Sequence, residues 1–556
     1  MILKQTKLNQ PRFVIGPPGT GKTHIWILQK YLELYRKYGA DKIILLSHTK
    51  VAKNELKKAI QELEEIKNDS VIQEDENYFD YRISTIHAYC KKGGNKSVFD
   101  KKDDWPALCQ AAPFLLLKKS AQITKDPMKY HPFFKCNSEA HGRGMKIIDH
   151  WNSSVDPHES YKPYNLKHML RIKQIYEDFK NKRDTRTNLK RNLQDYCDMI
   201  DAFNRNPSDP EIDALIVDEA QDSSVPQLRA LEKMARNVKD GNVYYVGDPN
   251  QTIFTFAGSN PDYFEKLSVT NKYKELETGL RCSVAINNYC KAIIVPVWRQ
   301  YGYTRTWTPT EIEGNVYNLP NLIGSPGLNE LIDKIKTSKE SFLFTYRTEA
   351  SKNWIIPFLE KNGFKYSHLG NNQHVSDAEI NCHYTWPLFL KGETQSFDQL
   401  QSYWTHLKKE NKLKDSRIFK KIRKKDYTFQ EFVNLGYLDE SLKDKEDFYQ
   451  LVKIPKEEER RKKHDQRMIY IKTIINKYNL NQKSTIELGN FHQVKGLTRD
   501  NVIVDLTLTR AEPYFEQLYL YYVACSRGKH DLWILKTQKR RELGKKDEYI
   551  HQTNWR

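Results

Sequence analysis

The sequence predicts an α/β fold built on parallel sheets, and three stretches of its first half point to that class. The apolar segment RFVI leads into the glycine-rich stretch GPPGTGKT, and a helical pattern of apolar residues follows until Gly39. Two further strand candidates are KIILLS, residues 42–47, and DALIVDEAQD, residues 213–222. In the last stretch four apolar residues run directly into acids, which is typical of a strand buried on both faces of a parallel sheet.

The stretch GPPGTGKT has the composition and the setting of a loop that binds nucleotide phosphates. Its glycines allow backbone N–H groups to approach phosphate oxygens, and the start of the following helix adds positive potential. We expect Lys22 to reach the β- and γ-phosphates and Thr23 to bind Mg²⁺. The predicted phosphate-binding residues of this loop are Gly16, Pro17, Pro18, Gly19, Thr20, Gly21, Lys22 and Thr23.

Two acids at the end of the DALIVDEAQD strand complete the predicted chemistry. Ligands of open parallel sheets bind at the carboxyl ends of the strands. We therefore expect Asp218 to hold Mg²⁺ and Glu219 to orient and activate the attacking water. The alternative is an ordinary solvated strand end without a catalytic role.

Another strand candidate, VYYVG, leads into a segment that combines an amide with aromatic residues. Gln251 stands at the strand tip, where its amide is expected to contact the γ-phosphate or the attacking water, and Phe254 and Phe256 follow it. Stacking on bases is tolerant of sequence and worth about 1–3 kcal/mol per base. A phosphate sensor joined to stacking rings would couple hydrolysis to base movement, whereas the alternative for Phe256 is core packing.

The charge balance favours a polyanionic partner. The 556 residues include 90 Lys and Arg against 71 Asp and Glu, a formal net charge of +19, and so basic a chain is drawn to nucleic acid. We find no run of 18 apolar residues and no apolar core of a signal peptide at the N-terminus, so we expect a cytoplasmic protein. His131, Cys136, His141 and Cys109 match no common zinc spacing, which favours ordinary structural residues.

Ten stretches, in this order, resemble the motifs of superfamily 1 DNA helicases of the UvrD/Rep/PcrA kind. The first half holds GPPGTGKT, SHTKVAKNEL, STIHAYC, LQDYCDMI, LIVDEAQD and VGDPNQTIFTFAG. The second half holds LETGLRCS, FLFTYRTEA, NFHQVKGLTRDNVIV and YYVACSRGK. Each later motif is weak alone, but ten in the order of the family make coincidence negligible.

The resemblance implies two RecA-like parallel-sheet core domains in tandem, each with an inserted, mainly helical subdomain. The implied cofactors are ATP and Mg²⁺, and the implied partner is single-stranded DNA with its junctions to duplex. The implied domains are a first core of residues 1–90 and 190–275 with an insertion at 91–189, and a second core of residues 276–365 and 483–556 with an insertion at 366–482.

The same resemblance assigns site residues from both halves. Arg281 and Arg527 would reach the γ-phosphate from the second core domain, where an arginine finger is worth about 10³–10⁵ in rate. Gly496 would lie at the phosphates, and Gln5 or Gln10 is the candidate for the glutamine that reads adenine. Structural ion pairs and structural histidines are the alternatives. The implied strand contacts are His48, Thr49, Thr85, His87, Phe254, Phe256, Arg347 and His492.

The sequence departs from the family at positions that bind the nucleoside and the strand. Leu280 stands where the family has a tyrosine that stacks on adenine, and Thr498 replaces the acid that meets the ribose. Ala257 replaces an arginine, and Phe256 replaces a tryptophan, which offers less area for stacking.

The implied activity is that of an ATP-dependent DNA helicase or translocase moving 3′ to 5′ on single strands, which couples hydrolysis in the inter-domain cleft to strand movement and duplex unwinding. One alternative is an RNA or RNA–DNA helicase, because no residue visibly reads the 2′-hydroxyl. The other is an ATP-switched nucleic-acid remodeller or binding subunit that does not unwind alone.

Overall fold

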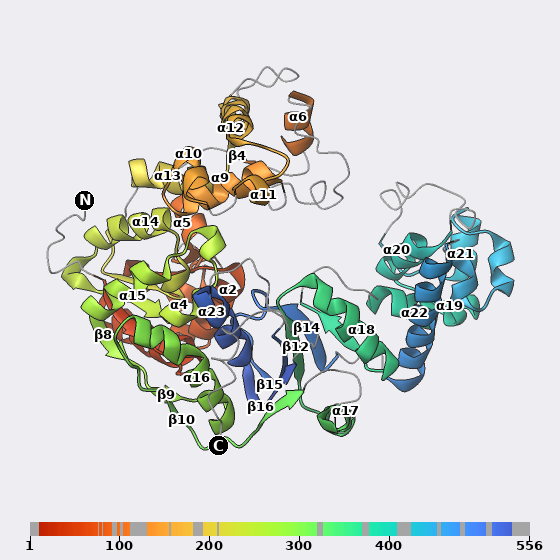
Figure 1. The fold of residues 1–556 in the computed structure, drawn as a ribbon. Coiled ribbons are helices and arrows are strands. Elements are labelled where there is room, and N and C mark those ends of the chain that lie inside the picture. The colour runs from red at the N-terminus through yellow and green to blue at the C-terminus, as the bar shows by residue number, and fades with distance from the viewer. Residues whose placement is uncertain are drawn as a thin grey trace. The chain divides into compact units, whose positions relative to one another are not determined.

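The computed structural model divides the chain into two compact units (Figure 1). Unit 1 comprises Met1–Ile312 and Ala511–Ser526, and unit 2 comprises Glu313–Arg510 and Arg527–Arg556. The residues that the structure describes are 11–75, 77–80, 82–91, 97–99, 104–111, 131–154, 157–181, 193–207, 211–319, 326–369, 377–408, 424–452, 457–478, 484–506 and 514–535.

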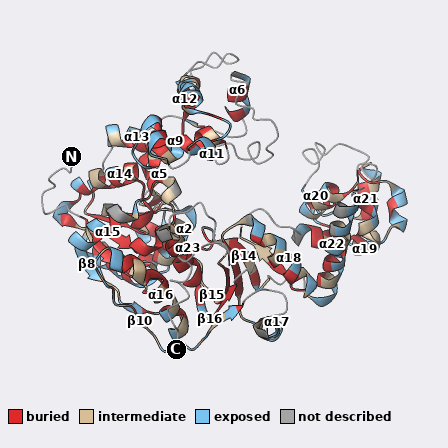
Figure 2. Ribbon diagram, in the orientation of Figure 1, coloured by how far each residue is buried: buried red, intermediate tan, exposed pale blue. Residues whose placement is uncertain are grey.

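Unit 1 is built on a six-stranded parallel sheet with the order β3-β2-β6-β7-β1-β8. The central strands are short apolar runs, and they are buried because helices cover them (Figure 2). The strands are β1 (Arg12–Ile15), β2 (Ile43–Ser47), β3 (Ile83–Thr85), β6 (Ala214–Val217), β7 (Val243–Gly247) and β8 (Lys272–Glu275).

Several helices of this sheet are capped at their first turns by short polar side chains. In α14, for example, Ser224 and Gln227 form a reciprocal capping box at the first turn. The helices are η2 (Lys22–Ile27), α1 (Leu28–Tyr38), η3 (Ala40–Lys42), α2 (Lys50–Gln61), α3 (Glu64–Lys67), α4 (Ser70–Gln73), α5 (Ile86–Lys91), α13 (Tyr196–Arg205), η5 (Ala220–Asp222), α14 (Val225–Arg236), η6 (Lys239–Gly241), η7 (Pro249–Gln251), η8 (Thr255–Ala257) and α15 (Pro261–Thr270).

In its described residues the segment between α5 and α13 is mainly helical, as predicted, and has an aromatic core of its own around Phe134 and Tyr176. Tyr176 also donates a hydrogen bond to Asp195 over 3.0 Å, at the cap of α13. The elements of this segment are β4 (Ser97–Val98), α6 (Asp104–Ala111), α9 (Pro132–Gly142), α10 (Ile147–Ser153), α11 (Pro157–Ser160), α12 (Leu166–Asn181) and β5 (Leu193–Gln194).

Two of the histidines and cysteines singled out in this segment take part in its local packing. Cys136 is buried in the aromatic core, and His131 caps α9 by accepting a hydrogen bond from the backbone N–H of Phe133. Within the described ranges no group of three or more His, Cys, Asp or Glu is arranged to hold a metal ion.

The division between the units differs from the predicted boundary at residue 275. Residues 276–312, with β9 (Thr278–Gly279), α16 (Val284–Gln300) and β10 (Thr308–Pro309), belong to unit 1, and so does α23 (Tyr514–Cys525). The physical reason lies in local contacts, since the N–H of Leu280 donates to the carbonyl of Gly19 over 2.8 Å and α16 packs on α23.

Unit 2 is built on a second six-stranded parallel sheet, with the order β11-β16-β15-β12-β14-β13, so both sheets agree with the predicted α/β class. The third strand of this sheet along the chain, β13, begins at Tyr366 and pairs with β14. The second insertion therefore begins after β13, and not at residue 366 as predicted. The strands are β11 (Val316–Leu319), β12 (Phe342–Tyr346), β13 (Tyr366–His368), β14 (Ile486–Asn490), β15 (Arg499–Asp505) and β16 (Gly528–Leu535).

The described residues of the segment after β13 are mainly helical, as predicted, and their core gathers aromatic rings around the fully buried Trp386. None of the helices in the described part of the chain has the length and apolar character needed to cross a bilayer. The helices of unit 2 are α17 (Pro326–Thr337), η9 (Glu349–Ser351), α18 (Lys352–Lys361), α19 (Asp377–Leu390), α20 (Phe397–His406), α21 (Phe429–Asn434), η12 (Glu440–Asp444), η13 (Phe448–Leu451) and α22 (Glu458–Lys477).

Candidate active site

The stretch GPPGTGKT forms the turn between β1 and η2, at the carboxyl edge of the first sheet. Gly19 has a φ of 75°, a left-handed conformation that glycine adopts without strain. A Cβ at this position would stand 2.4 Å from the Cβ of Arg281. Gly19 therefore permits both the turn and the close approach of the chain that carries Arg281.

The Lys22 side chain is buried inside this turn. Its ammonium donates hydrogen bonds to the carbonyls of Gly16, at 2.5 Å, and Pro17, at 3.0 Å. Burial lowers the pKa of Lys22 from its ordinary value, although the nearby carboxylates of Asp248 and Glu219 act to raise it. A phosphate bound in the turn would add negative charge beside this ammonium and favour its protonated form.

Thr23 and Asp218 meet across the sheet edge. The Thr23 hydroxyl lies 3.3 Å from each carboxylate oxygen of Asp218, which follows β6. Burial and the neighbouring Glu219 carboxylate raise the pKa of Asp218 to about 7. A hydroxyl beside a carboxylate is a pair of hard oxygen donors, and this donor chemistry fits Mg²⁺.

Glu219 is held in an unusual backbone conformation. Its φ of 52° is in the left-handed region, which a residue with a side chain adopts at a cost of about 1–3 kcal/mol. Gln221 donates from its amide Nε2 to the Glu219 carboxylate over 2.6 Å, while its Oε1 accepts from the backbone N–H of Asp248 over 3.2 Å. Gln221 therefore fixes the candidate base relative to the end of β7, a role that sequence reasoning missed.

Gln251 is buried in η7, immediately after β7. Its amide Nε2 donates to Oδ2 of Asp248 over 2.9 Å, and the hydroxyl of Tyr522 donates to the same oxygen over 3.3 Å. Neither Asp248 nor Tyr522 was singled out from the sequence, although both lie inside the quoted motifs. The contact spans 274 residues of chain and has no local signal.

Arg281 lies in unit 1 beside the phosphate loop, and not in a second unit as the resemblance implied. The positive charge of Arg281 disfavours the protonated form of Lys22. Burial lowers the pKa of Arg281 itself, and the nearby Glu219 carboxylate acts in the opposite direction. Two cations are thus held near each other at the loop, an arrangement that a polyanion stabilises.

Arg527 and Gly496 belong to unit 2. Arg527 is buried and its carbonyl accepts a hydrogen bond from the backbone N–H of Arg499 over 3.0 Å. Gly496 ends the turn after β14 with a φ of 86°. Their contacts with a nucleotide stay predictions.

The predicted strand contacts of unit 1 gather after β2, β3 and β7. Ser47 and Thr85 are paired in register, so His48 and Thr49 follow the same sheet edge as Thr85. The ring of His48 lies 5.6 Å from that of Phe254, and His87 contacts Tyr196 edge to face at 5.4 Å. The threonines also cap helices, since Thr49 and Thr85 accept hydrogen bonds from the N–H groups of Ala52 and Ala88.

The predicted strand contacts of unit 2 share one sheet edge as well. Arg347 follows β12 and His492 follows β14, and these strands pair in register up to Tyr346 and Asn490. The backbone N–H of His492 donates to the Asn490 side chain over 3.1 Å. Gln10 and the side chain of Phe256 lie outside the described residues, so their predicted roles are untested.

Comparisons with known proteins identify the first half of the chain. Residues 3–272 match the family model described as the UvrD/REP helicase N-terminal domain. Over 81 residues the chain is 32% identical to the RecBCD enzyme subunit RecB of Buchnera aphidicola subsp. Acyrthosiphon pisum (strain APS). That match covers 14% of this chain and only 7% of the length of RecB.

Among solved structures, the complex of Arterivirus nonstructural protein 10 (helicase) with DNA is similar over 95% of this chain and 62% of its own. With 10% identity and a TM-score of 0.30, this likeness carries no argument about the present chain. The sequence match and the parallel-sheet architecture carry the assignment instead. Residues 3–272 are therefore assigned to the UvrD/REP helicase family.

Proposed function

We propose that the chain is an ATP-dependent helicase or translocase that moves on single-stranded DNA, in the 3′ to 5′ direction. The observation that carries the proposal is that a glycine-rich turn gathers Lys22, Arg281 and Thr23 at the carboxylates of Asp218 and Glu219. Such a set of charges suits a nucleoside triphosphate that is bound and cleaved.

In this proposal Lys22 and the N–H groups of the turn hold the β- and γ-phosphates, with Gly16–Thr23 as the cradle. Thr23 and Asp218 would hold Mg²⁺, which neutralises charge on the phosphates. Arg281 stabilises the negative charge that develops on the transferring phosphoryl group, and Arg527 is proposed as a second finger.

Glu219 orients the attacking water and accepts its proton. The hydrogen bond from Gln221 restrains the carboxylate, and Gln251, restrained by Asp248, would contact the same water or the γ-phosphate through its amide. Because Gln251 and Phe254 belong to one short segment, a change at the phosphate is transmitted to a ring that can stack on a base.

The strand track of the proposal runs over His48, Thr49, Thr85, His87 and Phe254 in unit 1, and over Arg347 and His492 in unit 2. Hydroxyls, imidazoles and arginine suit contacts to phosphates that position a strand without reading its sequence. The net charge of +19 supports a polyanionic partner.

The experiment that tests the proposal is ATP hydrolysis by the full chain with single-stranded DNA, single-stranded RNA or no strand. Stimulation by DNA above RNA is the expected result. Stimulation by RNA alone would favour an RNA helicase, and hydrolysis that no strand stimulates would refute translocation.

A further inference from the structure

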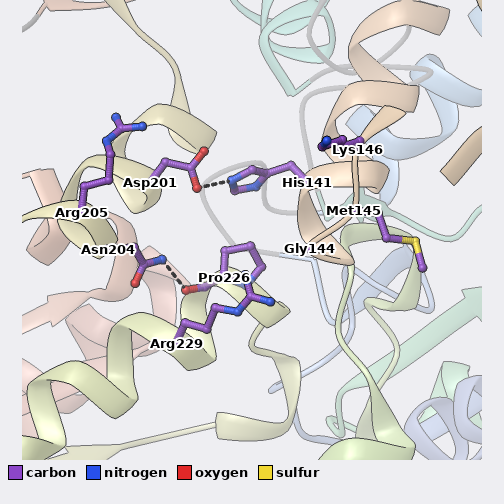
Figure 3. A pocket seen from close by; sticks show the side chains of 9 residues that line it. All are labelled: His141, Gly144, Met145, Lys146, Asp201, Asn204, Arg205, Pro226 and Arg229. Atoms are coloured by element: carbon purple, nitrogen blue, oxygen red, sulfur yellow. Dashed lines mark hydrogen bonds and ion pairs between the residues drawn. The ribbon is translucent and has the colours of Figure 1, made fainter. Parts of the chain in front are cut away.

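A pocket of about 360 Å³ lies where the first insertion meets the first core, outside the residues assigned so far. The turn between α9 and α10 forms one side, with Met145 and Lys146, and the helices α13 and α14 form the other (Figure 3). The nine residues that line it are His141, Gly144, Met145, Lys146, Asp201, Asn204, Arg205, Pro226 and Arg229.

The charge of this pocket is positive and largely uncompensated. Lys146, Arg205 and Arg229 are all exposed, and no acidic side chain in the described ranges forms an ion pair with them. The pocket's own acid, Asp201, is already engaged, because its Oδ1 lies 3.0 Å from Nε2 of His141. Figure 3 shows Arg229 reaching towards the turn at Gly144, and its guanidinium lies 3.6 Å from the position of a Cβ there.

The walls of the pocket are held in place by two contacts between separate segments. Asn204 donates from its amide to the carbonyl of Pro226 over 3.0 Å, which ties the end of α13 to the start of α14. On the insertion side, the backbone of Gly142 packs against Gly258, where a Cβ would stand only 2.1 Å from the Gly142 carbonyl carbon. Gly258 ends η8, the segment that follows Phe254, so the insertion touches the loop that carries the candidate stacking rings.

The pocket also continues the predicted strand track. The α13 helix begins at Tyr196, an exposed ring that contacts His87, and ends at Arg205 in the pocket. Arg205 is nine positions after Tyr196 in the sequence, so the two ends of the helix are about 14 Å apart at a rise of 1.5 Å per residue. Burial lowers the pKa of His87, and the charge of His141 in the pocket lowers it further.

We propose that this pocket binds a backbone phosphate of the single strand, beyond the contacts at Thr85 and His87. Arg229 and Lys146 supply charge from the core and from the insertion, and Arg205 adds to it from the rim. The apolar surface of Met145 and Pro226 is available to the adjoining sugar. The inference rests on the proposed function and adds a site through which a strand joins the insertion to the core.

The test is the salt dependence of strand binding by the full chain carrying Arg229→Ala and Lys146→Ala together. A fluorescent single-stranded DNA of 30 nucleotides serves as the probe, with binding followed by anisotropy between about 50 and 200 mM salt. The slope of log affinity against log salt is expected to shrink by about 0.7, one phosphate contact on a single strand, and affinity at low salt to fall about tenfold.

The matched control removes the same charge elsewhere in unit 1, by Lys266→Ala with Lys274→Ala, and should leave the slope at the wild-type value. Arg229→Lys alone should keep most of the slope, and equal melting temperatures exclude unfolding as the cause. A double variant that behaves as the control overturns the inference, and so does a loss that appears only with a blunt duplex of the same length. If the wild-type chain binds no strand at all, the proposed function fails first.

Discussion

The hydroxyl of Tyr522 donates a hydrogen bond to the carboxylate of Asp248 over 3.3 Å, in the buried interior of unit 1. The same carboxylate oxygen accepts a hydrogen bond from the amide Nε2 of Gln251 over 2.9 Å. The amide of Gln251 is therefore oriented from two parts of the chain, one of which lies five residues before Arg527. In the proposed mechanism this oriented amide contacts the γ-phosphate or the attacking water.

Tyr522→Phe should lower the turnover number for ATP about tenfold and change the KM for ATP little. The lost hydrogen bond to a charged group is worth about 1.5–3 kcal/mol, of which a part is felt in the transition state. Steady-state hydrolysis at saturating single-stranded DNA measures the effect. Tyr519→Phe, on the same helix, is the matched control, and an equal fall in both variants would assign the effect to packing of α23.

Glu219→Gln should reduce ATP turnover by about 10²–10⁴ while ATP and the strand still bind. The amide cannot accept the proton of the attacking water, but it keeps the size of the side chain. Single-turnover hydrolysis and equilibrium binding of a fluorescent ATP analogue separate the two effects. Turnover at the wild-type rate would remove Glu219 from the role of the base.

Phe254→Ala should weaken binding of single-stranded DNA by about 1–3 kcal/mol, because in the proposed function this ring, which lies beside His48, stacks on a base. The KM for ATP should change far less. Titration of the strand by anisotropy, beside ATP kinetics, gives the comparison. A proportional loss of both would indicate that the ring packs in the core of the unit.

The unfolding of the protein should depend on pH through His383 of α19. Burial lowers the pKa of His383 to about 4, from an ordinary value near 6.5, and its ring lies edge-on to Phe448 at 5.2 Å. Between these values the unfolded chain binds the proton and the folded chain does not, so stability falls as pH falls from about 6.5 to about 4.

The melting temperature measured across this pH range provides the check. His383→Gln should flatten the pH dependence relative to the wild type, whereas the same change at the exposed His158 should leave it unaltered. A wild-type profile that matches the His383→Gln profile would contradict the assignment.

The sequence predicted those parts of the site that are written in short runs of residues. An apolar strand, glycines at fixed spacing and a helix define the turn around Lys22, and an apolar run ending in acids defines Asp218 and Glu219. Thr23 follows β1 and Asp218 follows β6, and both strands end at the carboxyl edge of one parallel sheet. The sheet topology therefore brings Thr23 into contact with Asp218.

Contacts between distant segments could not be predicted in the same way. The approach of Arg281 to Gly19 depends on a glycine that tolerates it, and the bond from Tyr522 to Asp248 joins residues far apart in the chain. The strand at Tyr366 was missed because its three residues carry no alternation that separates them from the helices that follow.

Unwinding of tailed duplex DNA by the full chain tests the central claim most directly, that the site around Lys22 drives movement along a strand. We expect that a duplex with a 3′ single-stranded tail is separated in the presence of ATP and Mg²⁺, that a 5′-tailed duplex is not, and that Lys22→Ala abolishes separation. Hydrolysis with no separation of either duplex, or separation that persists in Lys22→Ala, would contradict it.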